Sequence, residues 1–426
     1  MTVGEPVREH PIPVPEPERL GGRYWRFLSA SALSNLADGI VKVGLPLVAV
    51  AYTRSPALVA GVAIAFSLPW LLFALPAGAL ADRFDRRRAM LAANTLRAVL
   101  VGLLAVAVAL DVGSIWLVYV VAFAVGVTET LHDTAGQSIL PQLVARDLLP
   151  QANGRLGAVE RTANAFIGPP LAGFLVAGGV ALALAGPAGL WALAVVAMLF
   201  VGGRFRVERV TTTSLRADIA EGLRFLWRHR LLRTLALMVG GSNFTTNAAL
   251  SVLVLYAVGA GSAVGLTEPA YGLLLTALAA GIVVGALTAT RLQRLLGRVW
   301  TLRVALASWA GLIGVPALTT NPYVIGAVFF GSGVLAAAWD VVTVSLRQRI
   351  TPDRLLGRVN GAYRLLAWGS VPLGAAAGGL LAELFGLRAV FAVMGVAALL
   401  LPFGMVRVTD AAIDAAEREA DRPAHR

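Results

Sequence analysis

Twelve long apolar stretches, most of them almost free of charged residues, constrain the fold of this chain more than any other feature. A helix needs about 20 apolar residues to cross the hydrocarbon core of a membrane. Hydrophobic residues make up 58% of the 426 residues, charged residues only 14%, and the mean hydropathy is +0.75. A soluble domain carries about 25% charged residues to cover its surface. The composition therefore predicts an all-α polytopic membrane protein.

The apolar stretches define the expected transmembrane helices, which are separated by short segments containing Pro, Gly and Asn. The fifth and sixth spans are the hardest to divide, and Gly178-Gly179 is the expected break between them. We expect spans near 26–51, 57–81, 89–110, 115–136, 156–177, 180–202, 232–258, 270–290, 301–318, 323–346, 358–382 and 387–406.

The arginines gather in alternate loops, and this asymmetry predicts the orientation of the chain. The opposite loops contain little more than Arg54 and Arg388. Because cytoplasmic loops carry the excess of Lys and Arg, we expect both termini in the cytoplasm and the protein in the inner (plasma) membrane. A nucleic-acid site would need one contiguous basic face. The net charge of +12 therefore indicates orientation and excludes nucleic acid as a partner.

The chain divides by composition into tails, two halves and a linker. Its first residues are polar and contain a proline run typical of a disordered tail. In the linker, the apolar residues Ile219, Leu223, Leu226 and Trp227 share one side of a helix among arginines. This pattern predicts an amphipathic helix on the inner leaflet or a solvated linker helix. The expected regions are a cytoplasmic tail 1–23, a six-helix bundle 24–202, the linker 203–231, a second six-helix bundle 232–406 and a cytoplasmic tail 407–426.

The two halves repeat each other at an offset of about 207 residues. Five short matches occur in the same order in both halves, among them Ser34-Asn35 with Ser242-Asn243 and Asp133 with Asp340. Parallel halves of six spans predict two bundles related by a pseudo-two-fold axis along the membrane normal. Such bundles can rock about a central site.

The loop between spans two and three contains a family signature. The run from Gly78 to Arg88, with acidic residues at Asp82 and Asp85 and an arginine cluster, resembles the signature loop of the major facilitator superfamily, and a degenerate copy runs from Gly285 to Arg298. Further motifs resemble the subgroup that contains the enterobactin exporter and macrolide efflux proteins. They are Ala37-Asp38-Gly39, Leu45-Pro46-Leu47, Ser55-Pro56, the segment from Pro141 to Asn153, Gly222-Leu223-Arg224-Phe225, Leu231-Leu232-Arg233 and Leu356-Gly357-Arg358-Val359. The resemblance covers residues 24–406 and implies a transporter that exports its cargo.

Charges at the predicted cytoplasmic ends of the spans can form a gate. A carboxylate there can accept hydrogen bonds from a helix N-terminus of the other bundle, and arginines can bind carboxylates through two parallel hydrogen bonds. Asp133 is the expected partner of an arginine of the signature loop, and Asp340 of Arg294 or Arg298. The alternative is that the arginines only hold the loops inside. The predicted gate residues are Gly78, Asp82, Arg83, Arg86, Arg87, Asp133, Asp340, Arg294 and Arg298.

Three charged residues lie near the middle of the first half. Asp38 is about 12 residues into span one, Lys42 follows one turn later, and Glu129 lies at a comparable depth in span four. Ionisable groups inside a membrane are costly and indicate function. We predict that Glu129, with Asp38 and Lys42, couples transport to protons. The alternative is an Asp38–Lys42 ion pair that only fixes helix packing. The repeat places Thr246 and Leu250 at the equivalent positions, which favours the functional interpretation.

Polar and aromatic residues of the spans expected to line a cavity suggest an amphipathic cargo. Asn35 and Asn243 can bind the cargo or only helix backbones. The predicted cavity residues are Asn35, Asn243, Asn247, Tyr256, Trp70 and Trp339. Span five contains a Gly-Pro-Pro motif at 168–170 that partly resembles a drug-antiporter motif, expected to bend the helix or to close the interface between the bundles.

The residue inventory argues against other chemistries. The chain has no cysteine, its four histidines show no ligand spacing for a metal, and no glycine loop followed by Lys can bind ATP phosphates. We therefore expect no enzyme activity, cofactor or metal site. The predicted function is proton-driven export of a small amphipathic molecule, such as a drug, a macrolide-like compound or a siderophore, by a monomer in contact with membrane lipids. Uptake, lipid flipping and a non-transporting membrane sensor remain the alternatives.

Overall fold

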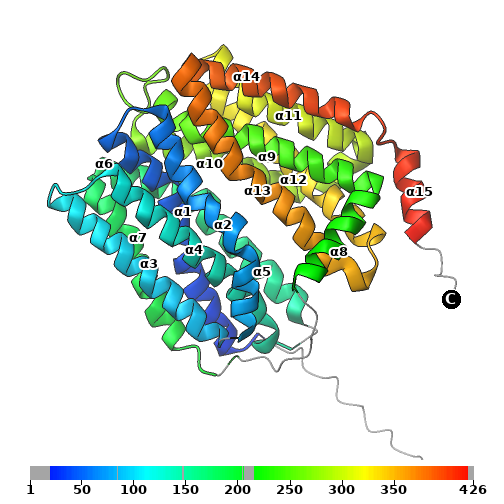
Figure 1. Ribbon diagram of the computed structural model, residues 1–426, viewed down its shortest axis with the longest axis horizontal. Helices are drawn as coiled ribbons and strands as arrows, with labels where there is room; N and C mark the ends of the chain where they lie inside the picture. Colours follow the sequence, from blue (N-terminus) through cyan, green and yellow to red (C-terminus); the bar gives the residue numbers. More distant parts are fainter. Residues whose placement is uncertain (1–19, 84, 146–147, 204, 206–214, 421–426) are drawn as a thin grey trace, which may run out of the picture.

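The computed structural model describes residues 20–83, 85–145, 148–203, 205 and 215–420. The regular elements of these residues are helices, and one isolated β-bridge joins Val258 to Leu266. The helices form two bundles that lie side by side (Figure 1). The first bundle comprises α1 (Gly22–Tyr52), α2 (Pro56–Arg83), α3 (Arg86–Ala109), α4 (Ile115–Ile139), α5 (Leu149–Arg161), η3 (Thr162–Ile167), α6 (Gly168–Ala177) and α7 (Val180–Leu199). The second comprises α9 (Arg230–Ala257), α10 (Glu268–Leu296), α11 (Arg298–Leu318), α12 (Pro322–Ile350), α13 (Asp353–Phe385), α14 (Leu387–Leu400) and η4 (Leu401–Met405).

All twelve expected spans correspond to helices of the structure. Ten helices of the described chain are long and apolar enough to cross a membrane. The other two spans are α9, which carries several polar residues, and span five, which is divided into α5, η3 and α6. The expected break at Gly178-Gly179 is confirmed, since α6 ends at Ala177 and Gly179 has a φ of 136°. Most helices run a few residues past the expected spans at the end of the molecule where α1 begins.

Span five contains a π-helix over Thr162–Ile167. Pro169 and Pro170 follow after Gly168 and cannot donate backbone hydrogen bonds to the preceding turn. Such local widening of a helix commonly marks a functional position. The broken helix packs on α1 on one side and on α10 of the second bundle on the other.

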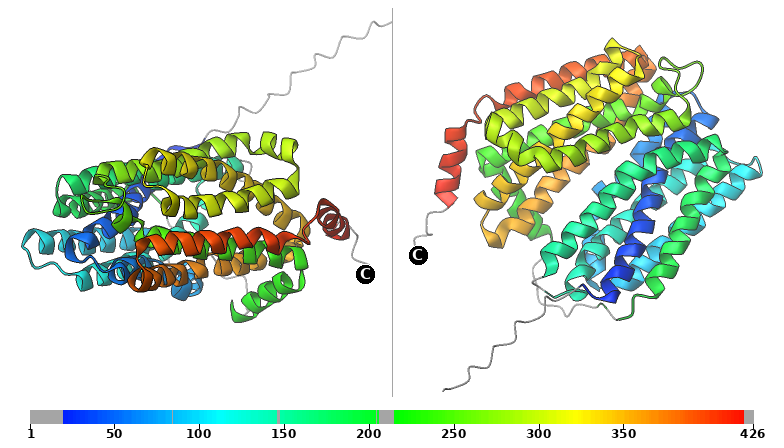
Figure 2. Two further views of the ribbon diagram at one scale, coloured as in Figure 1. Left: turned by 90° about the horizontal axis from the view of Figure 1, so that it is seen from above. Right: turned by 180° about the vertical axis from the view of Figure 1, so that it is seen from behind.

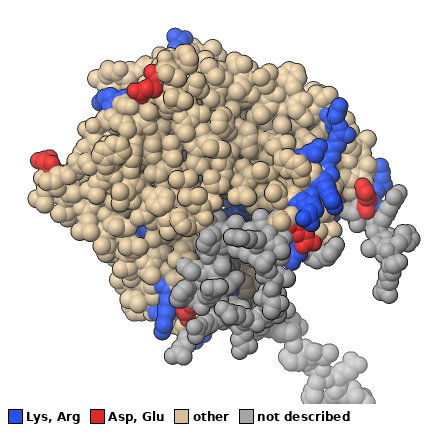
Figure 3. Space-filling model, viewed as in Figure 1, with Lys and Arg blue, Asp and Glu red and all other residues tan. Residues whose placement is uncertain are grey.

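The two bundles meet along two seams. Helix α2 packs along α13, and α6 packs along α10 (Figures 1 and 2). We call the end of the molecule that carries the start of α1 and the C-terminal helix α15 (Asp410–Ala420) the tail end, and the opposite end the far end. On the face shown in Figure 3, charged side chains lie mainly towards the two ends, with a broad uncharged surface between them. This distribution is the one that a membrane protein requires.

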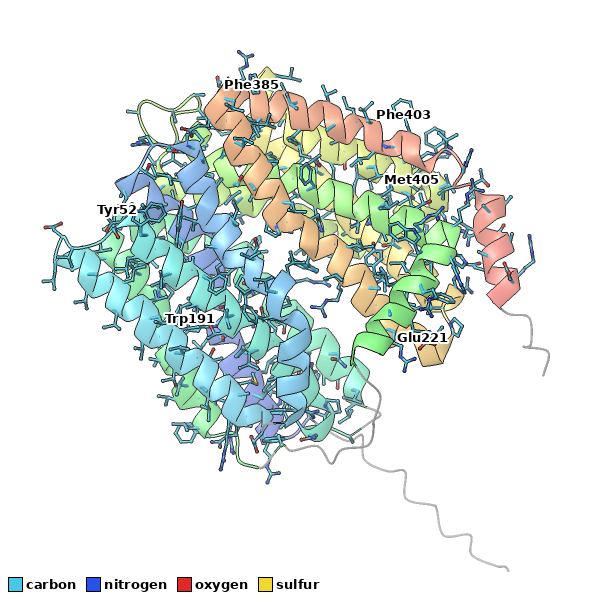
Figure 4. The ribbon with its side chains drawn as sticks, viewed as in Figure 1. Tyr52, Trp191, Glu221, Phe385, Phe403 and Met405 are labelled. Atoms are coloured by element: carbon cyan, nitrogen blue, oxygen red, sulfur yellow. The ribbon has the colours of Figure 1, made fainter. Side chains whose placement is uncertain are left out.

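Two further helices cover the tail end of the second bundle. In the linker, α8 (Leu215–Arg228) packs on α13, with Leu226 fully buried and Gly222 directly against the backbone of Arg358. Glu221, labelled in Figure 4, forms an ion pair with Arg358. A helix is therefore present in the linker. Leu226 of its predicted apolar side is buried against the protein, whereas Trp227 is 47% exposed. The C-terminal segment, expected to be a tail, forms α15, which buries Ile413 against the second bundle.

Candidate functional site

A cavity of about 350 Å³ lies between the two bundles near their middle. This volume falls within the range of small-molecule sites. The walls come from α1, α2 and α4 of the first bundle and from α9 and α13 of the second. The lining residues are Val41, Lys42, Leu45, Pro46, Val62, Ala63, Phe66, Ser67, Trp70, Glu129, Asp133, Asn247, Arg364, Trp368 and Val371.

An ion pair joins α1 to α4 on the wall of this cavity. Lys42 Nζ lies 3.0 Å from Glu129 Oε1, and the Lys42 side chain is 41% exposed whereas that of Glu129 is 5% exposed. Glu129 Oε2 is buried and has no hydrogen-bond partner among the described residues. The sequence offered no nearby cation for Glu129, and the structure supplies Lys42 from a different helix.

A second ion pair lies deeper in the first bundle. Arg97 Nη1 of α3 lies 3.1 Å from Asp38 Oδ1, and both side chains are almost completely buried. Arg97 Nε donates to Thr128 Oγ1 of α4 at 3.1 Å, and its guanidinium carbon lies 5.6 Å from the centroid of the Trp191 ring. Figure 4 shows Trp191 inside the first bundle. Asp38 therefore pairs with Arg97, and the alternative Asp38–Lys42 pair does not form.

The π-helix of span five is tied to α1 through Asn164. Its Nδ2 donates to Asn35 Oδ1 at 2.5 Å, and its Oδ1 accepts a hydrogen bond from Lys42 Nζ at 3.3 Å. Gly39 makes this approach possible, because a Cβ at that position would lie 2.7 Å from the Asn164 Cα atom and carbonyl oxygen. Asn35 thus binds a neighbouring helix, and it is absent from the cavity wall.

Two tryptophans of opposite bundles stack at the α2–α13 seam. The ring centroids of Trp70 and Trp368 are 6.1 Å apart with an interplanar angle of 25°. The guanidinium carbon of Arg364, one turn before Trp368 in α13, lies 5.9 Å from the centroid of Trp70. This geometry allows a cation–π contact across the seam.

The expected cavity residues of the second bundle have different positions. Asn247 lines the cavity, whereas Asn243 Nδ2 donates to the carbonyl oxygen of Ala367 at 2.7 Å. Tyr256 donates to the carbonyl oxygen of Pro316 and packs on Phe391 in the bundle core.

Trp339 is fully buried beside Trp309. Tyr256 and Trp339 therefore lie outside the described cavity, because their helices turn these rings into the core and not toward the other bundle.

The predicted gate residues do not form the expected pairs in the described structure. Asp133 Oδ1 lies 3.4 Å from Nδ1 of its neighbour His132, while Arg87 donates to the carbonyl oxygens of Met198 and Leu199 at the end of α7. Arg86 is mostly buried at the start of α3. Gly78, Asp82 and Arg83 belong to the end of α2, where the described structure does not include side-chain surroundings.

Arg298, a predicted gate residue of the second half, contacts the C-terminal helix α15. Arg298 forms ion pairs with Asp414 and Glu417 of α15, and not with Asp340. Arg294 borders a surface pocket with Arg298 near Asp410. Asp340 is exposed and has no ion pair among the described residues.

The contacts between the bundles in the described structure lie at the far end and at mid-depth. At the far end, Ser55 Oγ donates to Glu383 Oε2 at 3.0 Å. On the other seam, a Cβ on Gly173 would collide with the carbonyl oxygen of Glu268, and one on Gly272 would collide with that of Pro169. The Gly-Pro-Pro motif of span five thus lies at the interface between the bundles.

Four site residues were not identified as such in the sequence: Arg97, Asn164, Arg364 and Trp368. A signal existed for two of them, since Arg97 and Arg364 are ionisable residues inside expected spans 89–110 and 358–382. Asn164 and Trp368 carried no comparable signal, because amides and tryptophans are common in membrane helices. In the part of the chain that the structure describes, no group of three or more His, Asp or Glu residues can hold a metal ion.

Known proteins resemble this chain in sequence and in fold. Residues 23–425 match the family described as "Transmembrane secretion effector". The multidrug efflux pump Tap of Mycolicibacterium fortuitum is 29% identical over 401 residues, which cover 89% of this chain and 94% of that protein. The enterobactin exporter EntS of Salmonella choleraesuis is 29% identical over 292 residues, which cover 67% of this chain and 68% of that protein.

Solved transporters show the same fold at low sequence identity. The nucleoside transporter NupG superposes with a TM-score of 0.70 at 13% identity, covering 93% of this chain and 99% of that chain. A bacterial homologue of the iron transporter ferroportin, in its inward-facing state, gives a TM-score of 0.71 at 19% identity, covering 92% and 99%.

The family match and these relatives identify the chain as a membrane transporter of the major facilitator superfamily, and its two six-helix bundles have the fold of that superfamily. The chain belongs to the transmembrane secretion effector family. The family match and the relatives above together identify it as an efflux transporter of this superfamily.

Proposed function

We propose that this transporter exports a small amphipathic molecule in exchange for protons, with Glu129 as the proton-binding group. The observation that carries this proposal is the position of Glu129 on the cavity wall, with Oε1 bound to Lys42 and Oε2 buried without a partner among the described residues. A buried carboxylate with an unused oxygen can take up a proton there. Relatives named as a multidrug efflux pump and an enterobactin exporter support a drug-like or siderophore-like cargo.

Protonation of Glu129 would weaken its ion pair with Lys42. The ammonium group would then keep its hydrogen bond to Asn164 and become available to the cavity. Since Asn164 belongs to the π-helix of span five, and span five packs on α10 of the other bundle, the proton changes a contact that leads to the seam. The expected consequence is a shift in the balance between states open to opposite sides of the membrane.

Asp38 has a different role in this proposal. Its carboxylate is paired with Arg97 and lies behind the cavity wall, so the Asp38–Arg97 pair fixes α1 against α3 and α4 and keeps Lys42 in place. Glu129 then exchanges the proton, Lys42 responds to its charge, and Asp38 positions Lys42.

The proposal also assigns an orientation in the membrane and a gate at each end of the cavity. The arginine-rich tail end faces the cytoplasm, with both termini inside and the protein spanning the plasma membrane as a monomer among lipids. The described contacts at the far end then close the cavity toward the outside. In the opposite state, Asp82, Asp133 and Asp340 would find arginines of the signature loops across the tail end.

The test is transport in proteoliposomes with an imposed pH gradient, using norfloxacin, a planar amphipathic drug, as the probe. Wild-type protein is expected to accumulate the probe against its gradient and to lose this activity when an uncoupler is added. Glu129→Gln should lose more than about 90% of gradient-driven accumulation, because the amide cannot exchange a proton.

Asp111→Asn is the matched control. Asp111 is an exposed carboxylate in a far-end turn with a φ of 58°, a conformation that Asn adopts readily, and the variant should transport normally. Normal coupling in Glu129→Gln would refute the proposal. Accumulation in the opposite direction would support uptake, and movement of fluorescent lipid between leaflets would support a flippase.

A further inference from the structure

The ionisable groups that line the cavity are divided between the two bundles in a way that the proton mechanism does not use. The first bundle contributes Lys42, Glu129 and Asp133, a formal charge of +1 and twice −1. The second contributes Arg364, with a charge of +1. One wall therefore carries a net negative charge and the facing wall a net positive charge.

Both walls keep an unused polar group. Arg364 is exposed and has no ion pair in the described part of the chain, and its guanidinium carbon lies 5.9 Å from the centroid of Trp70. On the opposite wall, Glu129 Oε2 is buried and without a hydrogen-bond partner among the described residues. The buried oxygen of Glu129 favours a ligand that donates a hydrogen bond to it, and the exposed guanidinium of Arg364 can bind an acidic group of the same ligand.

A flat aromatic surface borders the same cavity. Trp70 and Trp368 stack across the seam beside Arg364 and also line the cavity. Tryptophan faces bind planar rings and the apolar parts of a ligand. The three features lie in one cavity: an acceptor on α4, a donor on α13 and a planar surface between α2 and α13.

We propose that the cavity selects zwitterionic molecules with a planar aromatic ring, binding their amine at Glu129 and their carboxylate or other acid at Arg364, with the ring against Trp70 and Trp368. This inference rests on the proposed export function and names the cargo class of that site. A purely cationic molecule would leave Arg364 without a counter-charge, and a purely anionic molecule would leave Glu129 Oε2 unsatisfied. The walls thus disfavour both single-charge classes.

A matched set of probes with the same ring system tests the proposal. Norfloxacin is zwitterionic at neutral pH, its ethyl ester is cationic and its N-acetyl derivative is anionic. Binding to the purified full-length protein in detergent, without a proton gradient, is measured by equilibrium dialysis at neutral pH. Wild-type protein should bind the zwitterion about tenfold more tightly than either the ester or the N-acetyl derivative.

The variants assign each preference to one wall. Arg364→Gln should abolish the preference for norfloxacin over its ester, with the affinity for the ester within about twofold of wild type. Arg364→Lys should keep part of the preference. Glu129→Gln should abolish the preference over the N-acetyl derivative. Arg303→Gln is the control, because Arg303 also lies over a tryptophan, 5.6 Å from the Trp300 centroid, but does not line the cavity. It should bind all three probes as wild type does.

Several outcomes would overturn the assignment: no preference in wild type, no binding of any probe, or an equal loss of all three affinities in Arg364→Gln. The transport assay separates this inference from the proposed function. Zwitterion-selective binding without proton-driven transport would refute the proposed export function but not the proposed zwitterion site. Proton-driven transport of all three probes at equal rates would refute the proposed zwitterion site but not the proposed export function.

Discussion

Arg97 and Arg303 occupy equivalent places in the two halves of the repeat, yet they have different surroundings. Arg97 is fully buried, paired with Asp38 and in contact with Trp191. Arg303 is partly exposed, lies over Trp300 and donates to the carbonyl oxygen of Val408 near the tail end. The reason is the partner, since Thr246 stands where the first bundle has Asp38. A carboxylate beside a buried arginine compensates the cost of placing that charge inside a membrane bundle.

The difference extends to the whole of each bundle. Among the described residues, the buried charged side chains of Asp38, Arg86, Arg97 and Glu129 all belong to the first bundle. The buried polar residues of the second bundle are Ser and Thr, which can bond to their own helix backbone. One bundle thus contains the charges that can respond to a proton, and the other supplies a largely apolar body against which it moves.

The largest effect is expected from breaking the buried pair of the first bundle. Arg97→Gln leaves Asp38 without its counter-charge and should destabilise the protein by about 3–5 kcal/mol, measured as thermal unfolding in detergent. The equivalent change Arg303→Gln removes a partly exposed cation and should cost less than about 1 kcal/mol. The double variant Asp38→Asn with Arg97→Gln should recover part of the loss, since neither group then carries an unpaired charge. Equal losses in Arg97→Gln and Arg303→Gln would show that the two bundles do not differ in this way.

A smaller effect is expected where α1 approaches the π-helix. Gly39→Ala places a Cβ against the Asn164 backbone and should destabilise the protein by about 1–3 kcal/mol while lowering transport, because Lys42 loses its link to span five. Gly44→Ala in the same helix has open space at its Cβ and is the matched control. Unfolding and transport assays on both variants check the prediction, which fails if the two behave alike.

The smallest effect concerns the core of the second bundle. Tyr256→Phe removes one hydrogen bond, to the carbonyl oxygen of Pro316 at 2.6 Å, and should cost about 1 kcal/mol. Its transport rate and probe affinity should stay within about twofold of wild type, because the ring lies outside the cavity. A large loss of affinity with unchanged stability would place Tyr256 in the binding site after all.

Much of the fold and part of the site could be predicted from local patterns. The spans follow from apolar stretches of membrane length, and the break at Gly178-Gly179 from residues that tolerate unusual backbone angles. Ionisable residues inside spans pointed to Asp38, Lys42 and Glu129 as one cluster. Their pairing could not be predicted, because spacing along a helix favoured Asp38 with Lys42, four residues apart, over partners on α3 and α4.

Which residues line the cavity could likewise be predicted only in part. Trp70 and Asn247 line the cavity in the structure, whereas Tyr256 and Trp339 face the core and Arg364 was overlooked. Hydropathy does not reveal which side of an all-round apolar helix faces the other bundle. The rotation of α9, α12 and α13 about their axes decides this.

The sequence by itself determined that the chain crosses a membrane twelve times, that its halves repeat, and that its charges are concentrated in alternate loops. Those properties depend on the length of apolar stretches and on the cost of placing charge in lipid, and both are local. Only the tertiary structure decided that Lys42 binds Glu129, that Arg97 neutralises Asp38, and that Arg364 faces the cavity. These choices depend on how helices distant in sequence rotate and pack, because a buried charge is stable only beside the partner that packing brings to it.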